Sequence, residues 1–285
     1  SMLRQRLSSH RPRYVVYRGI VSAHTLSAKV FSLKGCTQAN LIAIRNECVL
    51  VSMLSHENIV RYLAHRSLPE QGEVHLYYEY CPLRLSDLIH QKRTNANGLS
   101  PLMVANALLD VAHALHYLHD FLDVPIVHAD VRPLNVAVRQ FGQAEGIARE
   151  FELALSGFGA AFRIDQNSLT EHNSLLIPTA NQLRAPELHL DLEFREPVDI
   201  WAFGMLTFEL MTLNTPYAAE NTPDVVQAIV DGVLPKRIFV CKYDGNDPHG
   251  DTENGNEPFD ILWSNIVDLQ QRCLTFDPLQ RPKAA

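Results

Sequence analysis

The sequence predicts an α+β protein in which a small β-rich part precedes a larger helical part. Runs of β-branched and aromatic residues, bounded by turn residues, occupy the first hundred positions. From residue 100 onward, apolar residues recur at the three- and four-residue spacing of helices. At roughly 150 residues per domain, the length suggests about two compact units. Clefts between such units are common ligand sites.

The β-rich part is expected to hold strands at 14–17, 26–31 and 73–80. Between the last two of these strands, a helix is expected from the spacing of its apolar residues, which are Leu41, Ile44, Cys48, Val51 and Leu54. The chain is expected to pass into the helical part near residues 80–83, which would form a hinge.

Two long helices dominate the expected helical part. The first covers 102–119 and begins at Ser100, an N-cap residue that is followed by proline. The second covers 198–213 and is nearly all apolar, so we expect it to be buried. A short strand is expected at 136–138. The segment 241–258 combines acidic residues with Gly, Asn and Pro without a hydrophobic period, which predicts a long surface loop.

Composition and charge disfavour several classes of protein. With 46 % hydrophobic and 20 % charged residues, the chain is globular rather than disordered. The net charge of −7 argues against a nucleic-acid partner, which a basic surface would bind. No apolar run approaches the ~20 residues of a membrane span. The five scattered cysteines form no CxxC pair and predict an intracellular protein, cytoplasmic or nuclear.

A series of short motifs stands along the chain in a fixed order. They are Lys29 in an expected strand, Glu47 in the next helix, His-Ala-Asp-Val-Arg-Pro-Leu-Asn at 128–135, Gly-Phe-Gly at 157–159, Ala-Pro-Glu at 185–187, Asp199 and Arg281. Independent chance matches in this order and spacing are implausible. The sequence therefore resembles the eukaryotic protein-kinase domain over essentially residues 14–285.

The resemblance implies a bilobal protein-kinase fold, with an N-lobe at 3–81 and a C-lobe at 82–285. Family members usually continue past Arg281 with another helix, so we expect the C-terminus to be truncated and the parent chain to be longer.

Five residues match the family's catalytic positions. Lys29 would pair the α- and β-phosphates of ATP, and Glu47 would hold this lysine. The competing interpretation, two solvated surface charges, is disfavoured because Glu47 adjoins the apolar helix face. Asp130 would accept the proton of the substrate hydroxyl. Asn135 would be an amide ligand of a magnesium ion, and Arg132 would keep a cation near the transferred phosphate.

The resemblance also implies a nucleotide-binding wall. Tyr78 stands at the gatekeeper position of the back pocket, and the hinge that follows would meet an adenine. The residues expected to contact the nucleotide are Val16, Ala28, Lys29, Tyr78, Glu79, Cys81 and Ala137.

Other matching positions are expected to be structural. His128 would pack in a spine with Phe158. Glu187 and Arg281 would form a buried ion pair, and Asp199 would accept hydrogen bonds from the catalytic loop.

The departures from the family pattern decide the expected function. Gly157 replaces the aspartate that carries the principal magnesium ion, and glycine supplies no ligand. Ser9, Arg11 and Tyr14 occupy the three positions of the glycine-rich loop, where side chains keep the backbone from closing over phosphates. Ala129 replaces the arginine that clamps a phosphorylated activation loop.

These departures predict a pseudokinase, a kinase-fold binding or allosteric scaffold module with weak or absent phosphotransfer. Protein partners are expected, ATP is expected to bind weakly, and magnesium is not expected to bind tightly, with Asn135 as a weak metal ligand. The alternative is an atypical active Ser/Thr protein kinase that uses Lys29, Asp130 and Asn135 without the missing aspartate.

Overall fold

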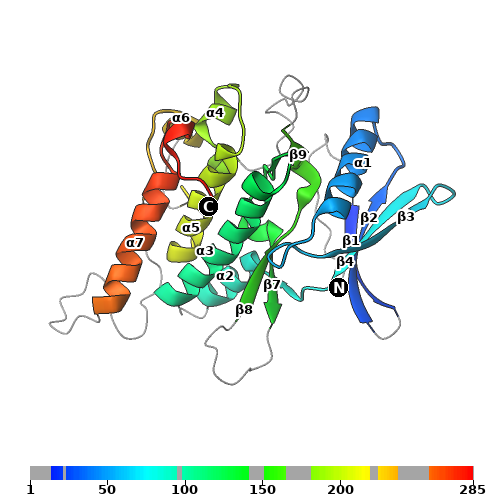
Figure 1. Ribbon diagram of the computed structural model, residues 1–285, viewed down its shortest axis with the longest axis horizontal. Coiled ribbons are helices and arrows are strands. Elements are labelled where there is room, and N and C mark those ends of the chain that lie inside the picture. Colours follow the sequence, from blue (N-terminus) through cyan, green and yellow to red (C-terminus); the bar gives the residue numbers. More distant parts are fainter. Residues whose placement is uncertain are drawn as a thin grey trace.

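In the computed structural model, the described residues are 14–21, 24–94, 98–140, 151–164, 181–218, 224–236 and 257–284. Strands gather in the N-terminal part of the chain, and helices fill most of the C-terminal part (Figure 1). The α+β class and the bilobal arrangement expected from the sequence are therefore confirmed.

The N-terminal part is built on a four-stranded antiparallel sheet with the order β1-β2-β4-β3. Its strands are β1 (Tyr14–Val21), β2 (His24–Ser32), β3 (Tyr62–Leu68) and β4 (Glu73–Glu79). The register of β1 on β2 sets Val16 opposite Lys29. Beside this sheet lies α1 (Gln38–Met53), whose N-cap Thr37 accepts a hydrogen bond from the Asn40 N–H at 3.2 Å (Figure 1).

Three of these strands lie where the sequence predicts strands, whereas β3 was missed. The five central residues of β3 are exposed, and the strand forms an edge of the sheet. A strand of this kind lacks the alternation of apolar and polar residues that marks a half-buried strand. Backbone pairing with β4, rather than side-chain burial, defines it.

The C-terminal part holds helices α2 (Leu85–Thr94), α3 (Pro101–His116), α4 (Pro186–His189), α5 (Pro197–Thr212), α6 (Val225–Val230) and α7 (Glu257–Cys273). One small sheet joins β5 (Leu83–Arg84), β7 (Val136–Gln140) and β8 (Phe151–Leu155), and another joins β6 (Ile126–Val127) to β9 (Phe162–Arg163). Single helical turns are η1 (Tyr117–Phe121), η2 (Pro133–Asn135), η3 (Phe158–Ala160), η5 (Asn181–Leu183) and η6 (Pro278–Gln280).

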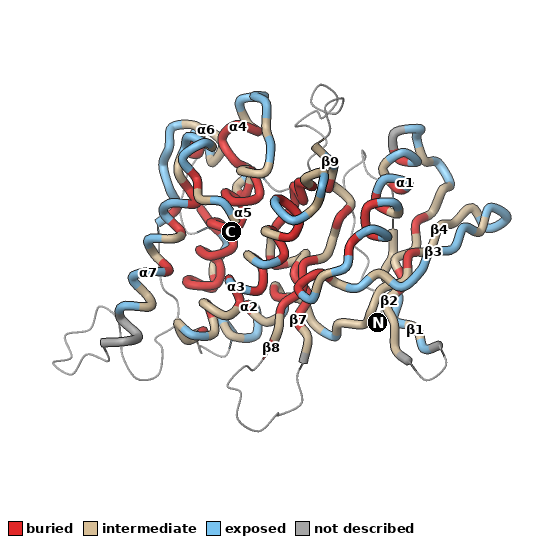
Figure 2. Tube along the Cα trace, in the orientation of Figure 1, coloured by how far each residue is buried: buried red, intermediate tan, exposed pale blue. Residues whose placement is uncertain are grey.

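The core of the C-terminal part surrounds α5, which is buried along nearly its whole length (Figure 2). Its side chains Trp201 and Met205 are at most 1 % exposed. The helix contacts both α3 and α7. This burial confirms the expectation drawn from its nearly uninterrupted apolar sequence.

The two parts of the chain meet at the hinge, along the loop after α1, and where α1 contacts η3. The chain leaves the first sheet at Glu79 and enters the second at Leu83, so the predicted boundary after residue 81 lies in the connection between them. The loop after α1 also pairs with β8. There the Val60 N–H donates to the Leu155 carbonyl at 2.9 Å, and the Leu155 N–H donates to the Asn58 carbonyl at 2.8 Å.

Most of the predicted surface loop at 241–258 lies outside the described residues. Its last two positions, Glu257 and Pro258, already belong to α7, so the loop ends earlier than the sequence suggested. Among the described residues, no helix combines the length and the apolar character that crossing a bilayer requires.

Candidate nucleotide-binding site

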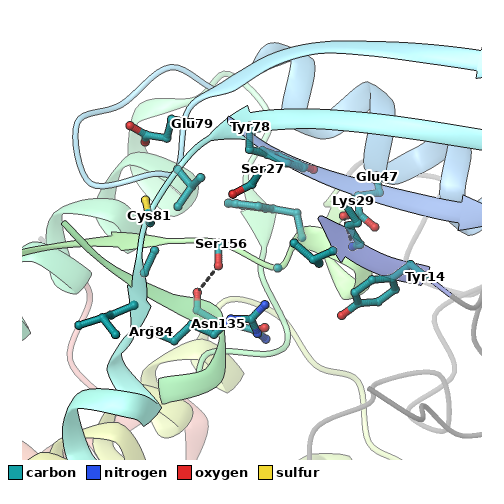
Figure 3. A pocket seen from close by; sticks show the side chains of 16 residues that line it. Tyr14, Ser27, Lys29, Glu47, Tyr78, Glu79, Cys81, Arg84, Asn135 and Ser156 are labelled. Carbon is teal, nitrogen blue, oxygen red and sulfur yellow. Dashed lines mark hydrogen bonds and ion pairs between the residues drawn. The ribbon is translucent and has the colours of Figure 1, made fainter. Parts of the chain in front are cut away.

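A pocket of about 130 Å³ lies between the two sheets, and its lining comes from both parts of the chain (Figure 3). Side chains of β1, β2 and α1 form one wall, the connection after β4 forms the back, and β7 with the residues around Gly157 forms the floor. The pocket is lined by Tyr14, Val16, Ser27, Lys29, Glu47, Val60, Tyr78, Glu79, Cys81, Leu83, Arg84, Asn135, Ala137, Ser156, Gly157 and Phe158.

The prediction that Ala28 contacts the nucleotide needs correction. Successive residues of a strand point to opposite faces, so the pocket face of β2 carries Ser27, Lys29 and Phe31. Ala28 is buried and does not line the pocket. Ser27 takes its place in the wall.

Lys29 and Glu47 form a buried ion pair, with the Lys29 Nζ and Glu47 Oε1 atoms 2.5 Å apart. Their side chains are 12 % and 4 % exposed, so they are not two solvated charges. Gly159 lies directly against the pair, because a Cβ atom built on it would be 3.0 Å from Glu47 Oε2. The absence of a side chain at Gly159 therefore leaves room for the pair.

Two aromatic rings also lie close to the Lys29 ammonium group. Its Nζ atom lies 4.3 Å from the ring centre of Tyr14 and 4.8 Å from that of Phe31. A cation is attracted to the face of an aromatic ring at such distances. The charge of Lys29 is therefore compensated by Glu47 and these rings within the protein itself.

The carboxylate of Asp130 is engaged at both oxygens. The Arg132 Nε atom lies 3.1 Å from Oδ1, and the Asn135 Nδ2 donates to Oδ2 at 2.7 Å. The same Nδ2 donates to the Asp130 backbone carbonyl at 2.8 Å. Three residues predicted to be catalytic thus form one connected cluster, in which Asp130 is only 3 % exposed.

Asp199 holds the backbone of the predicted catalytic loop in place. Its Oδ2 accepts from the His128 N–H at 2.7 Å, and its Oδ1 accepts from the Ala129 N–H at 2.8 Å. His119 Nε2 lies 2.9 Å from Oδ2. Ala129 has φ 60°, a conformation that alanine disfavours. These hydrogen bonds stabilise the strained turn.

His128 is buried against Phe158, with ring centres 4.8 Å apart and planes at 70°. Burial lowers the pKa of this histidine, which favours the neutral ring. Its Nε2 lies 2.9 Å from the Ser156 carbonyl, the geometry of a donated hydrogen bond. His128 and Phe158 therefore pack together as the resemblance implied.

Glu187 and Arg281 form a bidentate buried pair, with N–O distances of 2.6 and 2.8 Å. Arg281 Nη1 also donates to the Pro197 carbonyl at 2.9 Å, and its guanidinium lies 5.1 Å from the Trp201 ring centre. This pair ties α4 and the start of α5 to the end of the described chain.

At Gly157 the backbone has φ +84° and ψ 38°. A Cβ atom built there would lie 2.5 Å from Asn135 Oδ1 and 2.6 Å from its Cγ. The Asn135 side chain therefore fills the space that a side chain at position 157 would need. The sequence predicted a missing ligand, and the structure adds that its place is taken.

The donor set around Asn135 does not fit a magnesium ion. Such an ion is usually held by one or two carboxylates together with phosphate oxygens. The carboxylate hydrogen-bonded to Asn135, that of Asp130, has both oxygens engaged. Within the described ranges, no group of three or more His, Cys, Asp and Glu residues is arranged to hold a metal.

The hinge residues have separate roles. The Glu79 carboxylate points away from the pocket (Figure 3), pairs with the Arg139 guanidinium and accepts from the Arg61 N–H at 2.8 Å. Burial raises the pKa of the Cys81 thiol to about 11, so this cysteine is a thiol at neutral pH. Tyr78 is also buried, which raises the pKa of its phenol well above the usual value.

Ser27, Arg84 and Ser156 were absent from the predicted site. The Ser156 hydroxyl donates to the Asn135 carbonyl at 2.8 Å, which is the dashed line in Figure 3. Arg84 Nη1 donates to the Leu134 carbonyl at 3.1 Å. No local pattern marks Arg84, because it reaches the pocket through the pairing of β5 with β7.

Of the three expected glycine-loop positions, only Tyr14 is among the described residues. Ser9 and Arg11, two of the expected glycine-loop positions, are not among the described residues. Tyr14, the third loop position, begins β1 and lines the pocket. Val16 and Ala137 line it as expected.

Comparison with known proteins places the chain in a family. The family model of the protein kinase domain matches residues 15–285. The kinase and exchange factor for Rac B of Dictyostelium discoideum is 24 % identical over 278 residues, which cover 95 % of this chain and 22 % of that protein. Serine/threonine-protein kinase VIK of Arabidopsis thaliana is 28 % identical over 237 residues, covering 83 % and 49 %.

Integrin-linked protein kinase 1 of Arabidopsis thaliana is 27 % identical over 204 residues, covering 70 % of this chain and 39 % of that protein. The chain thus spans less than half the length of each of these three relatives. The match to the family model covers almost the whole chain, and the order of the motifs agrees with it. The chain belongs to the protein kinase domain family.

Proposed function

We propose that this domain is a pseudokinase, a kinase-fold binding or allosteric module with weak or absent phosphotransfer. The observation that carries the proposal is the contact between Gly157 and Asn135. The asparagine side chain fills the place where the family's magnesium-binding aspartate would project. Without that ion, the charge on the β- and γ-phosphates has no direct metal compensation.

The surroundings of Lys29 support the same proposal. A lysine that binds phosphates must present its charge to the ligand, whereas the ring centres of Tyr14 and Phe31 lie 4.3 and 4.8 Å from the ammonium nitrogen of this one. ATP is therefore expected to bind weakly, and magnesium is not expected to strengthen its binding.

The proposed role is to bind protein partners as a signalling scaffold. The proposal is supported because the interactions that hold the fold together are kept, whereas residues that would handle phosphate in the family are replaced. The Glu187–Arg281 pair and the Asp199 hydrogen bonds still hold the helical part together. A cytoplasmic or nuclear location belongs to this proposal, because the cysteines described in the structure are all free thiols.

The second candidate is an atypical active Ser/Thr protein kinase. The intact Lys29–Glu47 pair and the Asp130–Asn135 cluster favour it, as do the relatives named as serine/threonine kinases. In this alternative, Lys29, Asp130 and Asn135 would work without the missing aspartate.

A phosphotransfer assay separates the two candidates. Wild type and Asp130→Asn are compared with ATP and either magnesium or manganese, on a generic protein substrate. We expect no transfer above background from either protein. Transfer by wild type that Asp130→Asn abolishes would contradict the pseudokinase proposal and establish the active kinase.

A further inference from the structure

The pocket between the two sheets carries one positive charge that no acidic group offsets. The charged side chains in its lining are those of Lys29, Glu47, Glu79 and Arg84. Lys29 is paired with Glu47, and Glu79 points out of the pocket to Arg139 (Figure 3). In the part of the chain that the structure describes, the Arg84 guanidinium forms no ion pair with a carboxylate. Arg84 is therefore the unbalanced charge of the lining.

The guanidinium of Arg84 is fixed in position by the backbone below it. Its Nη1 atom donates to the Leu134 carbonyl at 3.1 Å, the one hydrogen bond of this side chain within the described ranges. The neighbouring acid, Asp87, accepts from the backbone N–H of Arg84 instead, at 3.1 Å. A guanidinium has five N–H donors, so donors remain for a ligand. Because the group is already held in place, less conformational entropy is lost when a ligand binds it.

The surroundings of Arg84 in the pocket are apolar. Leu83 precedes it in β5, and Ala137 is its partner in β7. Val16 and Val60 also belong to the lining, whose volume is about 130 Å³. For comparison, an apolar cavity of about 150 Å³ holds a benzene molecule. The space therefore fits one aromatic ring, with an attached group that reaches the guanidinium.

The charge of Arg84 identifies the attached group. A carboxylate carries one negative charge, and its two oxygens match the two parallel N–H donors of a guanidinium. A phosphate monoester carries a charge of roughly −1.5 to −2 at neutral pH, so Arg84 would leave part of that charge unbalanced. An uncharged group would leave the charge of Arg84 without a partner. Because unpaired charge is costly to bury, the carboxylate is favoured over both alternatives.

We propose that the pocket is a site for a small aromatic carboxylate, with Arg84 as the residue that binds its acidic group. The inference goes beyond the proposed function, because it concerns a ligand that has no phosphate and needs no metal ion. It also gives a role to Arg84, which determines the preference for an acid over its uncharged counterpart.

The test compares three ligands that share one ring, namely benzoate, benzamide and phenyl phosphate. Benzoate and benzamide have nearly the same shape and differ in charge. Each ligand is titrated into the wild-type domain at neutral pH in metal-free buffer, and saturation-transfer NMR gives its dissociation constant. We expect benzoate to bind at least about tenfold more tightly than benzamide, because it adds hydrogen bonds between charged groups. We also expect it to bind more tightly than phenyl phosphate.

Three results of these titrations would overturn the proposal. Benzamide that binds as tightly as benzoate would show that the charge of Arg84 does not select the ligand. Phenyl phosphate that binds more tightly than benzoate would refute the assignment to a carboxylate. Binding of none of the three would refute the site. These comparisons use the wild-type domain, so they test the proposal even where a substitution impairs folding.

A pair of charge-removing variants tests the role of Arg84. Arg84→Gln removes the charge and keeps an amide that can donate to the Leu134 carbonyl. It is expected to weaken benzoate binding about tenfold and to leave benzamide binding unchanged. Arg66→Gln is the matched control, because Arg66 is exposed on β3 and does not line the pocket. A preference for benzoate that survives in Arg84→Gln, or equal losses in both variants, would contradict the assigned role.

A third variant locates the ring of the ligand. Ala137→Leu fills the space next to Arg84 and is expected to weaken benzoate and benzamide alike, about tenfold or more. Thermal melting checks that each variant is folded. Unchanged binding by folded Ala137→Leu would refute the assigned site. Phosphotransfer and the effect of magnesium on ATP binding decide the pseudokinase proposal, and none of these titrations measures them. The failure of either proposal is therefore distinguishable from the failure of the other.

Discussion

At position 157, the backbone conformation and a neighbouring side chain both favour glycine. The φ of +84° is one that L-residues rarely adopt, and the Asn135 side chain occupies the Cβ position. The sequence predicts that a metal ligand is lost there, because glycine has no side chain. It does not predict that the Asn135 side chain fills the space next to Gly157. That contact depends on a backbone angle and a side-chain rotamer that no local pattern encodes.

The first prediction concerns substitution of Gly157 by alanine. We expect Gly157→Ala to lower the free energy of unfolding by about 2–4 kcal/mol, through the positive φ and the contact with Asn135. Gly35→Ala is the matched control, because Gly35 has φ +72° and nothing within 4 Å of its Cβ position. Urea unfolding measures both variants. A cost at Gly157 no larger than that at Gly35 would refute the contact.

The second prediction concerns Glu209, a buried acid of α5. Burial raises the pKa of its carboxyl from 4.5 to about 8, with Arg132 acting in the opposite direction. Between these pH values the folded state binds more protons than the unfolded state, so this group makes stability fall as pH rises. The slope is at most about 1.4 kcal/mol per pH unit.

Replacing Glu209 with glutamine removes this titration. Glu209→Gln is therefore expected to gain stability relative to wild type as pH rises from 5.5 to 8.5, as measured by urea unfolding at both values. Other groups, including His128, titrate in both proteins, so their effect cancels when the free energy of unfolding of wild type is subtracted from that of the variant. A difference that stays constant across this range would show that Glu209 does not titrate there.

At the scale of elements, most helices and strands follow from the sequence, whereas the contacts between elements do not. The N-cap at Ser100 and the apolar run of α5 predict their helices, because both signals are local. Strand β3 was missed because its residues are exposed. Ala28 was predicted to contact the nucleotide, but it is buried and does not line the pocket. The sequence also does not predict that Arg139, a residue of β7, pairs with Glu79 at the start of the hinge.

Arg139 of β7 joins three segments at the junction of the two lobes. Its Nη1 donates to the Glu57 carbonyl at 2.5 Å, and its Nη2 donates to the Ile59 carbonyl at 3.4 Å. The same guanidinium pairs with the Glu79 carboxylate at the start of the hinge and lies 3.5 Å from Glu152 Oε1. The loop after α1, the hinge and the β7–β8 pair are thus connected through one side chain.

The third prediction is that Arg139→Met lowers the free energy of unfolding by about 2–3 kcal/mol, because hydrogen bonds to a charged group are lost. Hydrogen exchange at the Val60 amide, which donates to Leu155, should also become faster. Arg195→Met is the control, because Arg195 pairs with Glu193 on the surface and should cost under about 1 kcal/mol. Equal costs for the two variants would contradict a role for Arg139 at the junction.

At the scale of the whole molecule, the structural interactions of the kinase fold persist, while the Asn135 side chain fills the space next to Gly157. The buried pair of Glu187 and Arg281 and the hub at Asp199 were predictable, because each residue lies in an ordered series of motifs. The volume of the pocket, about 130 Å³, was not predictable, since it depends on where Tyr14 and Asn135 place their side chains.

The magnesium dependence of ATP binding tests the central claim most directly. Calorimetric titration of the wild-type domain with ATP, with and without magnesium, compares the two dissociation constants under otherwise identical conditions. We predict weak or undetectable binding in both titrations and no strengthening by magnesium, because Gly157 supplies no ligand and Asn135 fills its place. A dissociation constant in the low micromolar range that requires magnesium would contradict the claim.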